Sequence, residues 1–305
     1  MNAFENIITA FVSILFRLIG LLSPSSVNAV TGMLAALWFR LDRKHRHIAI
    51  DNLTRAFGQE RSESEIRVLA LNVFKNISRI LFEIGMSNYL TSGDLRRCFE
   101  IRGVQHIRAA LARGRGVLVL TAHLGNWEMM PAVSPILGIP VHVLYRPLDF
   151  KALDMFFVRL RSRFGANLIP AAHGMRKTLR SLRHGEAVVM LMDQNVDWYE
   201  GVFVDFFGHR ACTNKGLALL AIKTGAPVVP VFLVRERNRF VAEFCEEIPL
   251  VQTCDRTQDI EANTLRYNQA IEAAIRRHPD QWFWVHQRWK TRPYCPWPIE
   301  TSGCK

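Results

Sequence analysis

The sequence predicts an α/β fold with a mostly parallel central sheet flanked by helices, and a hydrophobic, membrane-associating helical region before it. From residue 116 onward, short β-rich apolar runs alternate with helical patterns. The runs are too apolar to face water, as is typical of parallel strands covered on both faces. The first 45 residues instead combine apolar stretches with a dense basic run. We therefore expect an anchor with its basic run in residues 1–45 and one α/β domain in residues 46–305.

The N-terminal region contains two apolar stretches, residues 4–22 and 27–39, and then the basic run 40–47. A signal peptide is not expected, because no basic segment precedes the first stretch. That stretch could span a bilayer if Arg17 snorkels, lie flat in the interface, or form core helices of a soluble domain. The apolar positions that share one helical face are Phe4, Ile7, Ile8, Phe11, Leu15 and Leu18. We favour membrane attachment, because clustered Arg and Lys beside an apolar helix are drawn to anionic headgroups.

The body of the chain starts with a helical pattern over residues 46–90, in which residues 62–65 resemble a helix start. The expected strands are 116–121, 139–144, 187–192, 227–234 and 240–248. The expected later helices are 152–164, 175–183, 215–224 and 260–277, the last one stopped by Pro279. No linker or internal repeat divides these segments.

Composition excludes several classes of protein. The 305 residues are 49% hydrophobic, which is not the composition of a disordered chain. Six cysteines without a CxxC pair are too few for a disulfide scaffold and do not form a zinc motif. A mean hydropathy of +0.05 is too low for a polytopic membrane protein. The net charge of +12 can attract nucleic acid, an anionic membrane or an acidic protein, but no recognised nucleic-acid motif is present.

One segment predicts chemistry. His123 follows the apolar strand 116–121, and parallel sheets bind ligands at this end of their strands. Glu128 comes five residues later. If His123 lies on the loop and Glu128 in the first turn of the next helix, the carboxylate can orient the imidazole as a general base. The alternatives are an incidental loop histidine and a glutamate that favours a helix N-terminus.

The segment 123–128 resembles the HxxxxE motif of the bacterial lipid A late (secondary) acyltransferases, within the lysophospholipid acyltransferase superfamily. Further matches follow in family order at 145–147, 161–165, 193–194, 206–208 and 279–290. The resemblance implies a transferase that moves an acyl chain from acyl–acyl carrier protein to a hydroxyl of a lipid A precursor. It also implies the cytoplasmic face of a bacterial inner membrane. We expect no metal, because the sequence has no HExxH motif and a thioester needs no metal activation, and we expect no cofactor besides the acyl–acyl carrier protein donor. The partners implied are acyl carrier protein, an anionic glycolipid and the membrane surface, but no nucleic acid.

Four further residues are expected to bind substrate. Arg161 matches the functional arginine of the family, and a guanidinium there could hold a phosphate or an oxyanion. Arg146 is a second such candidate, whose alternative is a structural salt bridge. Asp193 ends a predicted strand, where it serves a site or caps the following turn. Asn126 lies inside the HxxxxE segment.

The segment 282–290 is rich in aromatic and basic residues, which suit a wet bilayer edge and phosphates. We expect it to be an apolar strand in which His286 is structural. The residues 206–208 are expected to be core or to line an acyl chain.

Other functions remain open at this point. The acceptor could be a lysophospholipid, a phosphatidylinositol mannoside or another glycolipid, and a wet site would make the enzyme a thioesterase. Rivals from other classes are a nucleic-acid-binding protein and a catalytically silent membrane scaffold of the same fold.

Overall fold

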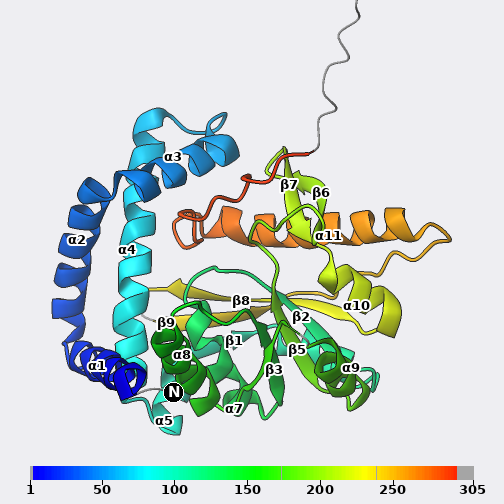
Figure 1. Ribbon diagram of the computed structural model, residues 1–305, viewed down its shortest axis with the longest axis horizontal. Coiled ribbons are helices and arrows are strands. Elements are labelled where there is room, and N and C mark those ends of the chain that lie inside the picture. Colours follow the sequence, from blue (N-terminus) through cyan, green and yellow to red (C-terminus); the bar gives the residue numbers. More distant parts are fainter. Residues whose placement is uncertain (1–2, 173, 238, 294–305) are drawn as a thin grey trace, which may run out of the picture.

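A computed structural model describes residues 3–172, 174–237 and 239–293, which form a sheet covered by helices (Figure 1). The larger sheet has seven strands in the order β1-β9-β8-β2-β5-β3-β4. Its strands are β1 Phe99–Arg102, β2 Val117–Thr121, β3 Val141–Tyr145, β4 Asn167–Pro170, β5 Ala187–Leu191, β8 Val228–Glu236 and β9 Arg239–Phe244. All neighbouring pairs are parallel except β8 and β9. The predicted mostly parallel α/β sheet is therefore confirmed.

The apolar runs in the sequence predicted the central strands. The structure contains further strands whose sequences have a weaker apolar pattern. Two short strands at the sheet edges, β1 and β4, were not predicted. Nor was the antiparallel hairpin of β6, Gly201–Phe206, and β7, His209–Asn214. The antiparallel pairing of β9 with β8 arises because a hairpin, and not a helix, connects these strands.

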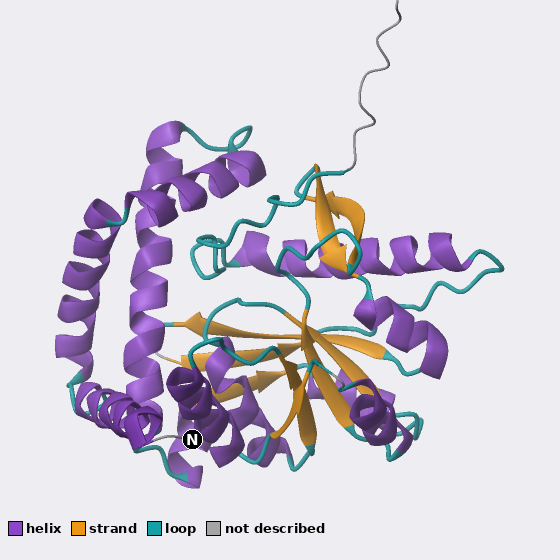
Figure 2. Ribbon diagram, in the orientation of Figure 1, coloured by secondary structure: helices purple, strands orange, loops and turns teal. Residues whose placement is uncertain are grey.

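Helices cover both faces of the sheet (Figure 2). Those after the N-terminal region are α5 Ser92–Cys98, α6 Val104–Leu111, the 3₁₀ helix η1 Trp127–Ala132, α7 Val133–Leu137, α8 Lys151–Arg163, α9 Met175–Arg183, α10 Gly216–Thr224 and α11 Arg256–Arg277. Successive residues of a strand point to opposite faces of the sheet, so the side chains of β2 belong alternately to two hydrophobic cores, one on each face. Leu118 and Leu120 pack with α10 and α11, whereas Val117 and Val119 pack on the side of α6 and α8.

Four helices form the N-terminal region: α1 Ala3–Ile19, α2 Pro24–Leu41, α3 Arg43–Phe57 and α4 Glu63–Ser87. Figure 1 shows α4 lying between α2 and the sheet, with α1 and α3 at its two ends. The helix start predicted at residues 62–65 is confirmed as a capping box between Ser62 and Glu65. The α4 helix thereby connects the N-terminal helices to the α/β domain.

Two glycines let α1 and α4 approach closely. A Cβ atom added to Gly20 would lie 2.3 Å from the carbonyl oxygen of Gly85, and one added to Gly85 would lie 2.5 Å from that of Phe16. Real Cβ atoms do not come this close to backbone oxygens, so a larger residue at either position would push the helices apart. The crossing of α1 over α4 therefore depends on both glycines.

The outward face of α1 is apolar and exposed, as the helical pattern predicted. Its exposed large side chains are Ile7, Phe11, Ile14, Leu15 and Leu18, and α2 adds Met33, Leu34, Leu37 and Leu41. Among the described helices, none has the length and hydrophobicity needed to cross a membrane. The described part of the chain thus presents an unburied apolar surface on two amphipathic helices.

The segment 282–290 differs from the prediction. It forms turns and not a strand. Trp282 and Trp284 are completely buried and donate their indole N–H groups to Asp193 and to the Pro279 carbonyl, so these tryptophans belong to the core. His286 is structural, as expected: its Nε2 accepts the backbone N–H of Asn195 at 2.8 Å. Phe206 and Phe207 are core residues, as expected.

Candidate active site

The loop after β2 brings the histidine to the C-terminal edge of the sheet. Gly125 in this loop has a φ of +62°, and a Cβ there would lie 1.9 Å from the carbonyl oxygen of Leu233. Only glycine fits, because the loop turns through the left-handed region directly against β8. Glu128 lies in the first turn of the next helix, η1, as predicted.

His123 is held by Asp193. Its ring nitrogen Nδ1 lies 2.9 Å from one carboxylate oxygen of Asp193, and its backbone N–H donates to the other oxygen, also at 2.9 Å. Asp193 follows β5, which pairs directly with β2, so the two residues meet at neighbouring strand ends. The side chain of His123 is 20% exposed and that of Asp193 is 1% exposed. The imidazole is therefore fixed on its buried side and open on the other.

The carboxylate of Asp193 is built to stay charged. Burial alone would raise its pKa, but attraction to His123 and hydrogen bonds from His123 and the Trp282 indole bring the pKa down to about 2. An ionised Asp193 accepts a hydrogen bond from Nδ1 when that nitrogen carries the proton. The other ring nitrogen, Nε2, then keeps its lone pair. Nε2 faces the amide of Gln194 at 3.4 Å, a long contact that a substrate hydroxyl can replace.

Glu128 does not make the contact that the sequence led us to expect. Both of its carboxylate oxygens accept hydrogen bonds from Arg161, at 2.7 and 2.8 Å, and one also accepts the Trp127 indole N–H at 3.1 Å. The expectation that Glu128 fixes the tautomer of His123 is corrected, since Asp193 makes that contact. Burial lowers the pKa of Arg161, but the Glu128 carboxylate outweighs this and raises it above its ordinary value. The two residues form a mostly buried, bidentate ion pair.

Aromatic rings connect the two carboxylates. The ring of Trp127 lies against His123 with 5.1 Å between centroids, and the same indole donates to Glu128. The Phe283 ring contacts both Trp127 and His123. The guanidinium of Arg161 lies over the Phe157 ring at 5.4 Å. Trp127 therefore contacts both the His123–Asp193 pair and the Arg161–Glu128 pair.

The other two expected substrate-binding residues lie in different surroundings. Arg146 is exposed at the end of β3, where a substrate can reach it. Asn126 is completely buried, and its amide nitrogen donates to Glu83 at 2.9 Å. With this placement Asn126 supports the loop from inside and does not face a substrate. Among the four expected residues, Arg161 and Asp193 therefore lie beside the predicted pair, and Asn126 lies behind it.

Three supporting residues were missed by sequence reasoning. Glu83 of α4 forms a bidentate pair with Arg235 of β8 at 2.5 Å, and it also holds Asn126. Arg288 is completely buried and donates to the Cys212 carbonyl at 2.8 Å. Burial lowers the pKa of Arg288 to about 10, although the negative charge of Asp193 opposes this shift. A charged residue within an apolar segment could have indicated these positions, because a buried charged side chain needs a partner of opposite charge or a hydrogen-bond acceptor.

A small apolar cavity lies below η1. It has a volume of about 40 Å³ and is bordered by Met130 and Pro131 of η1 and by side chains of β2, β3 and β5. Its walls are almost wholly apolar, among them Val119, Val143 and Val189.

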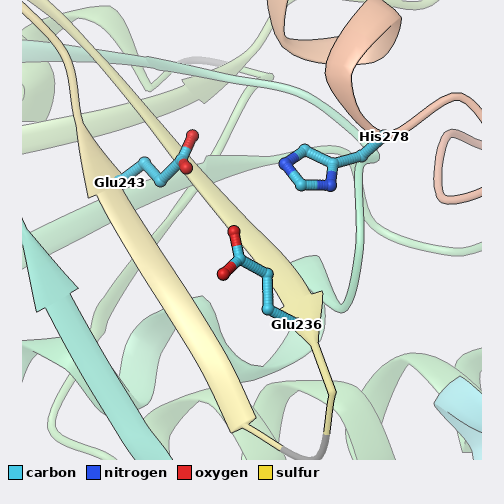
Figure 3. A group of neighbouring side chains, drawn as sticks. All are labelled: Glu236, Glu243 and His278. Atoms are coloured by element: carbon cyan, nitrogen blue, oxygen red, sulfur yellow. The ribbon is translucent and has the colours of Figure 1, made fainter.

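One cluster of possible metal ligands lies among the described residues. The side chains of Glu236, Glu243 and His278 face one another, with ligand atoms within 4.8 Å (Figure 3). Arg102 already donates to Glu236 at 2.8 and 2.9 Å, and Arg277 donates to Glu243 at 2.9 Å. Because arginines neutralise both carboxylates, we assign no metal to this cluster.

The fold and the site together are those of an α/β protein with a histidine–aspartate pair at the carboxyl ends of two neighbouring parallel strands. Residues 2–291 match the family described as bacterial lipid A biosynthesis acyltransferase, and the chain belongs to that family. The protein is accordingly an acyltransferase of lipid A biosynthesis type.

Curated relatives cover most of the chain at low identity. The lipid A biosynthesis palmitoleoyltransferase of Escherichia coli K12 is 28% identical over 82% of this chain and 80% of its own length. The lauroyltransferase of the same organism is 28% identical over 85% of this chain and 84% of its own. A phosphatidylinositol mannoside acyltransferase of Mycolicibacterium smegmatis is 26% identical over 65% of this chain and 64% of its own.

Proposed function

We propose that this protein moves a fatty acyl chain from acyl–acyl carrier protein to a hydroxyl of a lipid A precursor, with His123 as the general base. The observation that supports this most is the double contact of His123 with the buried Asp193. This contact leaves Nε2 with only the long contact to the Gln194 amide, at 3.4 Å. Membership of the family supports the acyl donor and the lipid A acceptor.

The proposed reaction needs a proton acceptor, and a positively charged group that stabilises the oxyanion or binds a phosphate. Nε2 of His123 takes the proton of the acceptor hydroxyl as its oxygen attacks the thioester carbon. The tetrahedral intermediate collapses, the carbon–sulfur bond breaks, and the imidazolium returns the proton to the departing thiolate. Asp193 stabilises the imidazolium in between. Arg161, held by Glu128, supplies positive charge for a phosphate or for the oxyanion. Arg146 at the surface is proposed as a second contact to the anionic substrate.

We also propose that the enzyme works on the cytoplasmic face of the bacterial inner membrane. The exposed apolar face of α1 and α2 would enter the interface, and the basic run at 40–47 would meet anionic headgroups. The remaining positive charge suits acyl carrier protein, which is acidic as a family. This arrangement brings a soluble donor and a membrane-bound acceptor to the same edge of the sheet.

Mass spectrometry of membrane lipids tests the proposed function. A strain that lacks the gene is complemented with the wild-type chain or with His123→Ala. The wild type should restore one acyl mass on lipid A and His123→Ala should not, although both chains are present in equal amount. An unchanged lipid A profile in all strains would exclude lipid A as the acceptor.

The second class of acceptor is a phosphatidylinositol mannoside or another glycolipid. The phosphatidylinositol mannoside acyltransferase among the relatives favours it. Purified protein with labelled acyl donor, offered a lipid A precursor, a glycolipid and a lysophospholipid separately, distinguishes the acceptors. Label released as free fatty acid in the absence of any acceptor measures the thioesterase reaction in the same experiment.

A further inference from the structure

A second, larger cavity lies between α2, α4 and the end of β8. Its volume of about 400 Å³ is in the range of small-molecule sites. We call it the α2–α4 pocket. The residues that line it are Asn28, Thr31, Gly32, Asn72, Lys75, Asn76, Arg79, Arg235, Arg237, Asp280 and Gln281. Its walls are polar, so it differs in kind from the apolar cavity below η1.

Positive charge dominates the pocket. Lys75 and Arg79 come from α4, and Arg235 and Arg237 come from the end of β8. Behind the wall, the carboxylate of Glu83 is shared by two of these groups, since Arg235 donates to it at 2.5 Å and Arg79 at 3.1 Å. With Asp280 as the single acid in the wall, the four cations are only partly compensated.

The two guanidiniums nearest the core repel each other. Burial lowers the pKa of Arg79, and the charge of Arg235 lowers it further, although Glu83 acts in the opposite direction. Lys75 and Arg237 are exposed and face the same cavity. An anion in the pocket would relieve this repulsion, and planar guanidinium groups suit the oxygens of a phosphate in particular.

The remaining wall offers neutral hydrogen-bonding groups. Asn28, Asn72 and Thr31 line the α2–α4 side. Thr31 is buried, and its Oγ1 has no hydrogen-bond partner within the described ranges. Amide and hydroxyl groups of this kind recognise the hydroxyls of a sugar or polyol.

Hydrogen bonds connect the residues around the pocket to the loop that carries His123. Gln281 exchanges two hydrogen bonds of 2.8 Å with the backbone of Arg235, and its carbonyl accepts the N–H of Gly125, two residues from His123. Glu83, which holds Arg235, also accepts the amide of Asn126 in that loop. The pocket is therefore tied to the loop of His123 by two short chains of hydrogen bonds.

We propose that the α2–α4 pocket binds the phosphate of a phosphorylated sugar or polyol headgroup. The cations hold the phosphate, and Asn28 and Asn72 contact the hydroxyls. That this headgroup is the headgroup of the acyl acceptor rests on the proposed function. Phosphate binding in the pocket does not rest on it.

Binding is tested without any acyl donor. The pocket variant is Lys75→Gln with Arg237→Gln, which leaves the Glu83–Arg235 pair intact. The matched control is Arg183→Gln with Lys223→Gln, which removes the same charge from exposed positions on α9 and α10. Calorimetry with glucose 1-phosphate, and with glucose as the uncharged comparison, measures a soluble headgroup. Sedimentation with phosphatidylcholine vesicles, with or without phosphatidic acid, measures a lipid headgroup.

The pocket variant should weaken phosphate-dependent binding at least about tenfold, because each charge-assisted hydrogen bond contributes roughly that factor or more. The control should remain within about twofold of the wild type, as expected for loss of distant, screened charge. Pocket-dependent binding of glucose 1-phosphate identifies a free sugar phosphate as a sufficient ligand, and pocket-dependent binding of vesicles alone identifies a membrane headgroup.

Equal weakening in both variants, or no phosphate-dependent binding by the wild type in either experiment, would overturn the proposal. If the proposed function is wrong but the pocket proposal is right, acyl transfer is absent while phosphate binding persists. The two failures can therefore be distinguished.

Discussion

Asp193 contacts His123 twice, through the ring nitrogen Nδ1 and through the backbone N–H, each at 2.9 Å. The ring orientation and the path of the loop are thus set by one carboxylate. This carboxylate lies 70 positions further along the chain. The oxygen that accepts the backbone N–H of His123 also accepts the indole N–H of Trp282, at 2.7 Å.

Replacing Asp193 by Asn should lower the turnover of acyl transfer by about 10² to 10⁴, while the KM for the acceptor changes little. The amide no longer stabilises the imidazolium and can select the wrong tautomer of His123. Steady-state kinetics with acyl–acyl carrier protein measures this effect. Near-normal turnover by a folded Asp193→Asn protein would contradict the role of Asp193, so the melting curve has to be recorded alongside.

Glu128→Gln should destabilise the fold by about 2 kcal/mol, because it leaves the guanidinium of Arg161 mostly buried without its counter-charge. The double variant Glu128→Gln with Arg161→Met should regain much of this free energy of unfolding, but not the acyl transfer activity. Urea denaturation of the two single variants and the double variant completes the cycle. Additive losses of stability would show that the ion pair does not couple the two residues.

The stability of the protein should fall between neutral and mildly acidic pH because of His286. Burial lowers the pKa of this imidazole from 6.5 to about 4. As the pH falls below 6.5, the unfolded chain takes up a proton that the native state refuses until about pH 4, so the native state loses stability across this window. From pH 7 to pH 5 the loss is about 2 kcal/mol.

His286→Gln tests this pH dependence, since an amide oxygen can still accept the N–H of Asn195 but does not titrate. The urea midpoint of the variant should change less between pH 7 and pH 5 than that of the wild type. Parallel curves for the two proteins would assign the acid sensitivity to other groups.

The apolar face of α1 should contribute directly to membrane binding. Phe11 is 65% exposed, and Phe11→Gln should weaken binding to anionic vesicles at least about tenfold, because an inserted aromatic side chain contributes about 1.5–3 kcal/mol. Val68 on α4 is 61% exposed, and Val68→Gln is the matched control with little expected effect. Vesicle sedimentation measures both, and equal behaviour of the two variants would place the membrane-binding surface elsewhere.

Local patterns predicted much of this fold. The strand at 187–192 and the helix at 175–183 agree with β5 Ala187–Leu191 and α9 Met175–Arg183, because their signals are periodicities within a few residues. The edge strands β1 and β4 have four residues each, too few for such a signal. The exposed side of α1 was predicted for the same reason as the strands, since its apolar positions repeat with the helical period.

The partner of His123 could not be predicted from spacing. Glu128 is near it in sequence, whereas Asp193 is near it in space, because β2 and β5 lie side by side in register from Val117 to Thr121. A signal was present, since both His123 and Asp193 directly follow apolar strands, and the ends of neighbouring parallel strands meet. Pairing His123 with Asp193 from this signal requires knowing that β2 and β5 are neighbours, and the strand order cannot be read from one sequence.

The glycine contact between α1 and α4 has a consequence for how the enzyme meets its substrate. Because Gly20 and Gly85 hold the two helices at backbone contact, the apolar face of α1 has a fixed tilt relative to the sheet that carries His123. An enzyme resting on this face would hold its imidazole at a constant height above the lipid surface. A bulkier residue at Gly20 would then act as a spacer, lifting the reacting nitrogen away from alcohols that cannot leave the headgroup layer.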